Sequence, residues 1–232
     1  MRRRYRLELR RLGVVLAAVA ASGVLASLSV APAEAQITFS GRSFGILVDP
    51  PLLGPTVVCD TGELPLTGGS LTDLVEDGSV SVSGQVLAAT RLNCVTAGAG
   101  VSASSTVEIE GLECTFNQLL TSVTLAASLV NAGTVADCSG RSGNTSISGL
   151  TIAGVAVAVT GEANQVVQIP GLATLVINEQ VHGMGEVTVN ALHLTLLDGT
   201  ECIIGGVHSD ILGCPPLPVE ESTWGKVKSL YR

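Results

Sequence analysis

The sequence predicts an all-β fold, a disulfide-stapled β-sandwich built from long hairpins. Apolar and polar residues alternate along most segments, and these segments are rich in Val, Ile and Thr, which suit a pleated strand. Gly, Ser, Asn and Pro separate the segments, as turns do. The 27 glycines also argue against helices, because each costs about 1 kcal/mol in a helix interior relative to alanine.

Residues 1–35 are predicted to be a signal peptide. Six arginines begin the chain, an apolar segment runs from Leu12 to Val30, and Ala33-Glu34-Ala35 fits an A-x-A cleavage site. The alternative is an uncleaved anchor, because the apolar segment is nearly long enough to span a bilayer. Small polar residues weaken that span, so we expect cleavage, export and no stable membrane span in the mature chain.

The charge of the mature chain excludes one class of partner. Six of the 12 Lys and Arg residues lie in the leader, but only two of the 20 acids, so cleavage changes the net charge from −8 to −12. Such a surface repels phosphate backbones and anionic lipid headgroups. We therefore expect no nucleic-acid partner.

Residues 36–214 form the predicted all-β domain. One short helix is expected at Ser70 to Asp77, with Ser70 as N-cap and Asp73 at the capping-box position. Pro170-Gly171 is expected to be a tight turn. Strands are expected at Thr38 to Val48, Ser79 to Asn93, Val101 to Glu110, Ser122 to Leu129, Thr145 to Val159, Gln165 to Ile169 and Ala173 to Ile177.

The segment from Gly185 to Cys214 closes the domain as a hairpin. A two-residue turn at Asp198-Gly199 would pair Leu197 with Thr200 and His193 with Ile204. Because side chains alternate, one face, the core face, would carry Leu192, Leu194, Leu196, Ile203 and Val207. The other face would carry His193, Thr195, Cys202 and His208.

A weak internal repeat leaves a second fold open. An alternating strand, a small residue and then a leucine recur at Val107 to Leu112, Ser146 to Leu150 and Val187 to Leu192. A period of about 40 residues could indicate a β-solenoid. The spacing is irregular and the segments between the repeats do not match, which favours the sandwich.

All six cysteines lie beyond the leader, and an even number in an exported chain predicts three disulfides. The spacing leaves all 15 pairings open. The absence of a C-x-x-C pair disfavours a zinc site. The cysteines are Cys59, Cys94, Cys114, Cys138, Cys202 and Cys214.

The closing hairpin also carries a family resemblance. VTVNALHLTLLDG, followed by IIGGVHSDI, resembles the closing hairpin of the choice-of-anchor P family of secreted bacterial proteins. SGRSFGILV (Ser40 to Val48), SGLTIAG (Ser148 to Gly154) and LVINEQ (Leu175 to Gln180) are similar to earlier landmarks of that family. The resemblance covers roughly Phe39 to Pro215. It implies export and attachment at the cell surface, and it implies no known chemistry.

We expect no catalytic site, no metal site and no cofactor. His208-Ser209-Asp210 has the residue types of a hydrolase triad, but on a strand Ser209 points away from its two neighbours, and no G-x-S-x-G elbow occurs. His193 and His208 would lie about 13 Å apart, too far to share a metal ion. Asp73, Glu76 and Asp77 resemble a calcium loop only in their acidity.

Residues 215–232 are predicted to be a Pro-rich linker and a C-terminal sorting or docking tail. The tail holds the only Trp and Tyr of the mature chain and both of its lysines. We expect Trp224, Lys226, Lys228 and Tyr231 to dock on a cell-envelope or sorting partner.

The predicted function is that of a secreted, non-enzymatic structural or adhesive domain at the cell envelope. The alternative is an extracellular module that binds a glycan or calcium, and a hydrolase is the least favoured. Few aromatic residues are available to stack on sugars, which weighs against glycan binding without excluding it.

Overall fold

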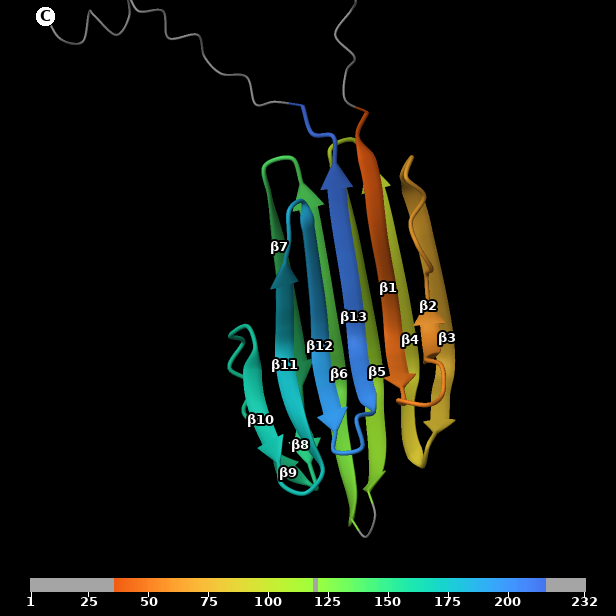
Figure 1. The fold of residues 1–232 in the computed structure, drawn as a ribbon, viewed down its shortest axis with the longest axis vertical. Helices are drawn as coiled ribbons and strands as arrows, with labels where there is room; N and C mark the ends of the chain where they lie inside the picture. The colour runs from red at the N-terminus through yellow and green to blue at the C-terminus, as the bar shows by residue number, and fades with distance from the viewer. Residues whose placement is uncertain (1–35, 119–120, 216–232) are drawn as a thin grey trace, which may run out of the picture. The chain divides into compact units, whose positions relative to one another are not determined.

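The computed structural model describes residues 36–118 and 121–215 (Figure 1). The predicted signal peptide and the docking residues Trp224, Lys226, Lys228 and Tyr231 lie outside the described residues. Within them, 13 strands form two antiparallel sheets that face one another. This is the expected β-sandwich, and no β-solenoid is seen among these residues.

The first sheet has six strands. Their spatial order is β10 (Gln165–Ile169), β11 (Ala173–His182), β12 (Glu186–Leu196), β13 (Glu201–Leu212), β1 (Thr38–Asp49) and β2 (Thr56–Asp60). Thr38 pairs with Leu212, so the two ends of the described chain lie at the same end of this sheet.

The second sheet has seven strands. Their order is β3 (Gly69–Val82), β4 (Gln85–Ala99), β5 (Ser102–Gln118), β6 (Thr121–Asp137), β8 (Thr151–Ile152) and β9 (Val155–Ala156), and β7 (Gly140–Ser148) also pairs with β6. Most of these strands follow one another along the chain through short turns, as expected for long hairpins.

Buried hydroxyl groups join the two sheets in the half of the core nearest the chain ends. The Ser43 hydroxyl donates to the Thr106 carbonyl over 2.6 Å, and the Ser105 hydroxyl donates to the His208 carbonyl over 2.6 Å. Thr134 and Ser209 share a hydrogen bond of 2.8 Å between their hydroxyls. Each bond links one sheet to the other, so these polar side chains are buried with their partners.

In each sheet, one row of residues marks the point at which the inward-facing side chains change from odd-numbered to even-numbered positions, or the reverse. We call this a change of parity. In β5, the buried residues are odd-numbered up to Ile109 and even-numbered from Leu112, and the switch occurs at Gly111, which has φ +61°. Every second strand has such a residue with positive φ, and the pairing continues on both sides of it. We call this the inversion row; its members are Asp77, Thr90, Gly111, Ser128 and Gly149 in the second sheet, and Cys59, Gly45, Gly205, Ala191 and Asn178 in the first.

The inversion row explains the weak internal repeat. The small residue of each repeat unit lies in this row, as Gly111, Gly149 and Ala191 do. The leucine that follows each of them is turned into the core: Leu112 is 2% exposed, Leu150 is 3% exposed and Leu192 is 0% exposed. The repeat therefore marks a backbone conformation that recurs in neighbouring strands of a sandwich, and it does not require the alternative β-solenoid.

The helix expected at Ser70 to Asp77 is wrong, because this segment is part of β3. Leu71, Leu74 and Val75 have helical spacing, but pairing with β4 decides the conformation and leaves Leu74 51% exposed. The strand expected at Ser79 to Asn93 is divided by a turn at Ser83 and Gly84. The strand expected at Gln165 to Ile169 and the Pro170-Gly171 turn are confirmed.

The register expected for the closing hairpin is wrong by one residue. Leu194 pairs with Cys202 and His193 with Ile203, because Leu197, Asp198 and Gly199 form a three-residue loop. Cys202 and Ile204 therefore face the core, and Ile203 lies on the outer face. The leucines and Val207 are buried as expected, since the switch at Gly205 turns Val207 inward.

Two disulfides form, and both link the two sheets. Cys59 of β2 is bonded to Cys94 of β4, and Cys138, after β6, is bonded to Cys214, after β13. The expectation of three disulfides is wrong for the other two cysteines, because Cys114 and Cys202 are buried free thiols. Their burial within the core explains how they fit without a bond, as small apolar side chains.

Candidate functional site

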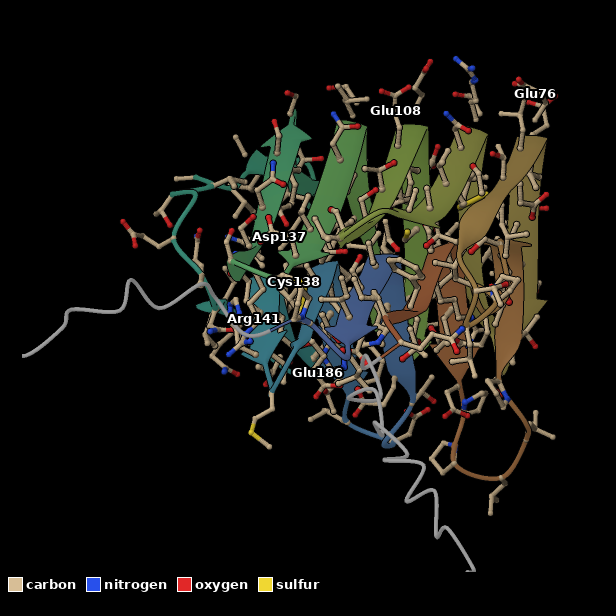
Figure 2. The ribbon with its side chains drawn as sticks, turned by 90° about the horizontal axis from the view of Figure 1, so that it is seen from above. Glu76, Glu108, Asp137, Cys138, Arg141 and Glu186 are labelled. Carbon is tan, nitrogen blue, oxygen red and sulfur yellow. A yellow bond between two sulfur atoms is a disulfide. The ribbon has the colours of Figure 1, made fainter. Side chains whose placement is uncertain are left out.

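The outer face of the second sheet carries an aligned set of amide and carboxylate side chains. Asn93 of β4 is opposite Glu108 of β5, and Glu108 is opposite Asn131 of β6. Side chains at directly opposite positions lie about 5 Å apart at Cβ. Figure 2 shows Glu108 projecting outward from this sheet, away from the first sheet.

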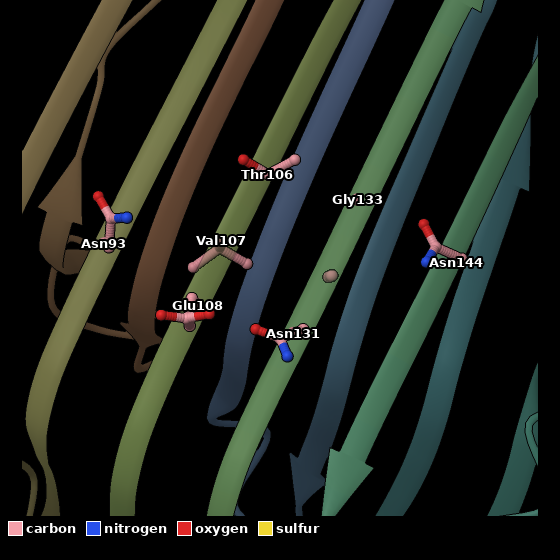
Figure 3. Close-up of a pocket in the computed structure, with 8 residues that line it drawn as sticks. Asn93, Thr106, Val107, Glu108, Asn131, Gly133 and Asn144 are labelled. Atoms are coloured by element: carbon pink, nitrogen blue, oxygen red, sulfur yellow. The ribbon is translucent and has the colours of Figure 1, made fainter.

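A shallow hollow interrupts this face at Gly133 (Figure 3). Gly133 lies two residues beyond Asn131 on β6, and it is opposite Thr106 of β5 and Asn144 of β7. Since glycine has no side chain, the surface sinks there into a hollow of about 310 Å³. The hollow is lined by Asn93, Thr106, Val107, Glu108, Asn131, Ala132, Gly133 and Asn144.

Four of the polar side chains around the hollow have no hydrogen-bond or ion-pair partner among residues 36–118 and 121–215; they are Asn93, Glu108, Asn131 and Asn144. Several polar side chains elsewhere in the sandwich are paired instead. Asn190, for example, donates to Glu179 over 2.6 Å. An asparagine amide both donates and accepts, so this face offers free hydrogen-bonding groups of both kinds.

Negative charge lies on the β3–β5 side of the hollow. Arg91 lies between Glu76 and Glu110, with N···O distances of 3.5 Å and 3.3 Å, and one arginine cannot neutralise both acids. Glu108 adds a further charge within the hollow. A neutral or cationic ligand fits this face better than an anion.

The acids compared with a calcium loop have structural roles. An Asp73 carboxylate oxygen accepts the Asp60 backbone N–H over 2.8 Å, and Glu76 pairs with Arg91. Asp77 has φ +52° in the inversion row. No group of three or more His, Cys, Asp or Glu side chains in the described part of the chain is arranged to hold a metal ion.

The triad residue types at positions 208–210 separate as expected. Ser209 is 0% exposed and bonds Thr134 and Ser105 inside the core, while His208 and Asp210 lie on the outer side of the first sheet. His208 Nδ1 is 2.9 Å from the Thr188 hydroxyl, on an open face. No described carboxylate bonds this histidine, so the acid member of a triad is not in place among the described residues.

A histidine between two carboxylates was missed from the sequence. His193 of β12 bonds Glu179 of β11 through Nδ1 over 2.8 Å, and Glu201 of β13 through Nε2. Burial opposes the charge on this imidazole, but the two carboxylates outweigh burial and raise the pKa of His193 above its usual 6.5. The register of three strands brings these residues together, and no local pattern in the sequence signals it.

The comparisons with known proteins add no relative. No family model matches the chain, and no curated protein or solved structure is similar to it. Residues 36–118 and 121–215 contain no helix that is long and apolar enough to cross a membrane.

Proposed function

We propose that this protein is a secreted, non-catalytic adhesive domain of the cell envelope that binds a glycan through the outer face of β4 to β7. The observation that carries this proposal is the set of unpartnered side chains around Gly133. Three amides and one carboxylate come from four neighbouring strands and point to the same side of a rigid sheet.

Polyhydroxylated ligands match the chemistry of these groups. A sugar hydroxyl can accept from an asparagine N–H and donate to an asparagine carbonyl or to Glu108. None of the described residues that line the hollow is aromatic, so they offer no ring for stacking, a strong part of many sugar sites. We therefore expect weak single-site binding that becomes useful through many copies on one surface.

Calcium fits the hollow less well than a glycan does. Calcium in proteins takes six to eight oxygen ligands, usually with several carboxylates. Glu108 is the one carboxylate among the described residues that line the hollow. The glycan is thus the favoured class of ligand.

The disulfides support the proposed location outside the cell, because such bonds persist in oxidising compartments. Membership of the choice-of-anchor P family, a cleaved leader and a docking tail belong to the same proposal. Cys214 closes the described domain just before the proposed tail and is bonded to Cys138 of the other sheet. A pull on the tail would therefore reach both sheets through a covalent bond.

A glycan array with the exported protein tests the binding face. Gly133→Val fills the hollow, and it should fold because Gly133 has no positive φ and its nearest obstacle is the Asn144 side chain, at 3.1 Å. Ala126→Val places a valine on the outer face of β6, away from the hollow, and serves as the control. We expect wild type and Ala126→Val to bind the same glycans and Gly133→Val to lose them. Equal binding by all three proteins would contradict the proposed face.

Deleting Val219 to Arg232 tests the proposed tail. We expect the shortened protein to appear in the medium instead of on cells, with its melting temperature unchanged. Continued attachment to cells would contradict an addressing role, and a large fall in melting temperature would indicate that the tail supports the fold.

A further inference from the structure

Exposed leucines cluster at the end of the sandwich that is opposite Gln36 and Pro215. Leu52 and Leu53, in the β1–β2 loop, are 96% and 58% exposed, and Leu197, in the β12–β13 turn, is 72% exposed. The two loops touch, because a Cβ on Gly199 would lie 3.3 Å from Pro51. We call Leu52, Leu53 and Leu197 the leucine tip. A concentrated apolar cluster of this kind indicates an interaction site.

The loop that carries this tip is stiff. Its sequence is PPLLGP, from Pro50 to Pro55, and each proline fixes its own φ. The Leu53 N–H also donates to the Pro50 carbonyl over 3.3 Å, which closes a turn. The leucines are therefore presented outward by a preorganised loop, and little conformational entropy is lost when they are buried.

A hollow of about 430 Å³ lies beside the leucine tip. Prolines and leucines of the β1–β2 loop line it together with Ser83, Asp198 and Thr200. Thr200 is 1% exposed, and its hydroxyl has no hydrogen-bond partner in the described part of the chain. A buried hydroxyl without a partner is costly, so a polar group supplied by a ligand would complete this hollow.

The charge around the tip restricts the ligand. Asp49 and Asp198 are exposed at the ends of the two loops, and none of the described residues that line the hollow is basic. Acidic groups repel anionic headgroups and attract ammonium groups. The tip thus combines apolar insertion with a preference for a neutral surface that carries cationic groups.

We propose that the leucine tip inserts into the interface of a zwitterionic lipid bilayer, where Thr200 donates a hydrogen bond to a lipid oxygen. A projecting apolar loop suits a soft surface better than a protein groove, because Leu52 has almost no contact with its own protein. Thr38 and Leu212 pair at the opposite end of the sandwich from this tip. The proposal is independent of the glycan face on β4 to β7.

Sedimentation of the exported protein with vesicles tests this proposal. We expect binding to phosphatidylcholine vesicles and much weaker binding to phosphatidylglycerol vesicles. Leu52→Asp and Leu197→Asp should each weaken the binding about tenfold or more. Leu66→Asp is the matched control, because Leu66 is 66% exposed and its carbonyl accepts the Phe39 N–H at the other end of the sandwich. It should bind as wild type does.

Two further results would overturn the proposal. One is that the wild-type protein stays in the supernatant with phosphatidylcholine vesicles. If it then also forms dimers that Leu52→Asp abolishes, the tip binds a second copy of the chain and not a bilayer. The other is an equal loss of binding in Leu66→Asp and Leu52→Asp. Thr200→Val should melt at a higher temperature than wild type but bind vesicles several-fold more weakly. Unchanged vesicle binding by this variant would overturn the role given to Thr200.

Discussion

The Thr90 hydroxyl donates a hydrogen bond to the backbone carbonyl of Glu110, 2.9 Å away on the neighbouring strand. Glu110 directly precedes Gly111, where β5 changes the parity of its inward side chains. The Ser128 hydroxyl likewise donates a hydrogen bond of 2.9 Å to the backbone carbonyl of Ser148, which directly precedes Gly149. A hydroxyl on the intervening strand thus satisfies a carbonyl beside each of these two glycines, and the sheet keeps its register across the row.

Gly111→Ala should lower the free energy of unfolding by about 1–3 kcal/mol. Gly111 has φ +61°, and an added Cβ would lie 2.6 Å from the Thr90 hydroxyl. Gly140→Ala is the control, because Gly140 has no positive φ and no atom within 4 Å of the added Cβ. Denaturant unfolding measures both. Equal stability of the two variants would show that the left-handed backbone at residue 111 is absent.

The register of the closing hairpin predicts unequal losses at neighbouring isoleucines. Ile204→Ala should destabilise by about 2–5 kcal/mol, because Ile204 is fully buried. Ile203→Ala should cost much less, since Ile203 lies beside His193 on the outer face. Chemical denaturation of the two variants compares them, and a larger loss at Ile203 would restore the register with the two-residue turn.

The cysteines predict a definite thiol count. Unfolding without reductant should expose two reactive thiols per chain, Cys114 and Cys202, and reductant should raise the count to six. The folded protein should react slowly. Burial, with a smaller effect of nearby acids, raises the pKa of Cys202 to about 12. Burial, with a smaller effect of the neighbouring Cys202, also raises the pKa of Cys114. A count of zero in unfolded, unreduced protein would show a third disulfide.

His193 predicts a pH-dependent contribution to stability. Its pKa in the folded protein lies above the ordinary 6.5, so the folded state holds the proton more tightly than the unfolded state. The stabilisation is therefore complete below pH 6.5 and is lost as the pH rises through the raised pKa. Wild type should exceed His193→Gln in stability most clearly in that acidic range. A difference that grows with rising pH would contradict the ion pairs with Glu179 and Glu201.

Alternation along the chain was enough to predict the fold class, because it is a local property of a strand with one buried face. It could not predict where the parity changes. Asn178 has positive φ within a strand, and nothing adjacent in the sequence distinguishes it from an ordinary polar residue. Asp77 precedes Gly78, a dipeptide typical of turns, yet it lies within β3. The repeated small residue before Leu112, Leu150 and Leu192 was a visible signal of the inversion row, although its period suggested another architecture.

The candidate site was beyond prediction from the sequence, because its members come from four strands. Asn93, Glu108, Asn131 and Asn144 share no motif, and only the pairing of β4 to β7 places them around Gly133. The closing hairpin shows the same limit on a smaller scale. A loop longer by one residue moved Cys202 and Ile203 to opposite faces from those expected.

The side-chain amide resonances of Asn93, Asn131 and Asn144 give the most direct test of the proposed binding face. Nitrogen-15-labelled exported protein is titrated with the oligosaccharide that gives the strongest array signal. We expect these three resonances to shift together, and those of Gln180 and Asn190 on the first sheet to stay in place. Shifts confined to the first sheet, or an array without any signal, would contradict the account.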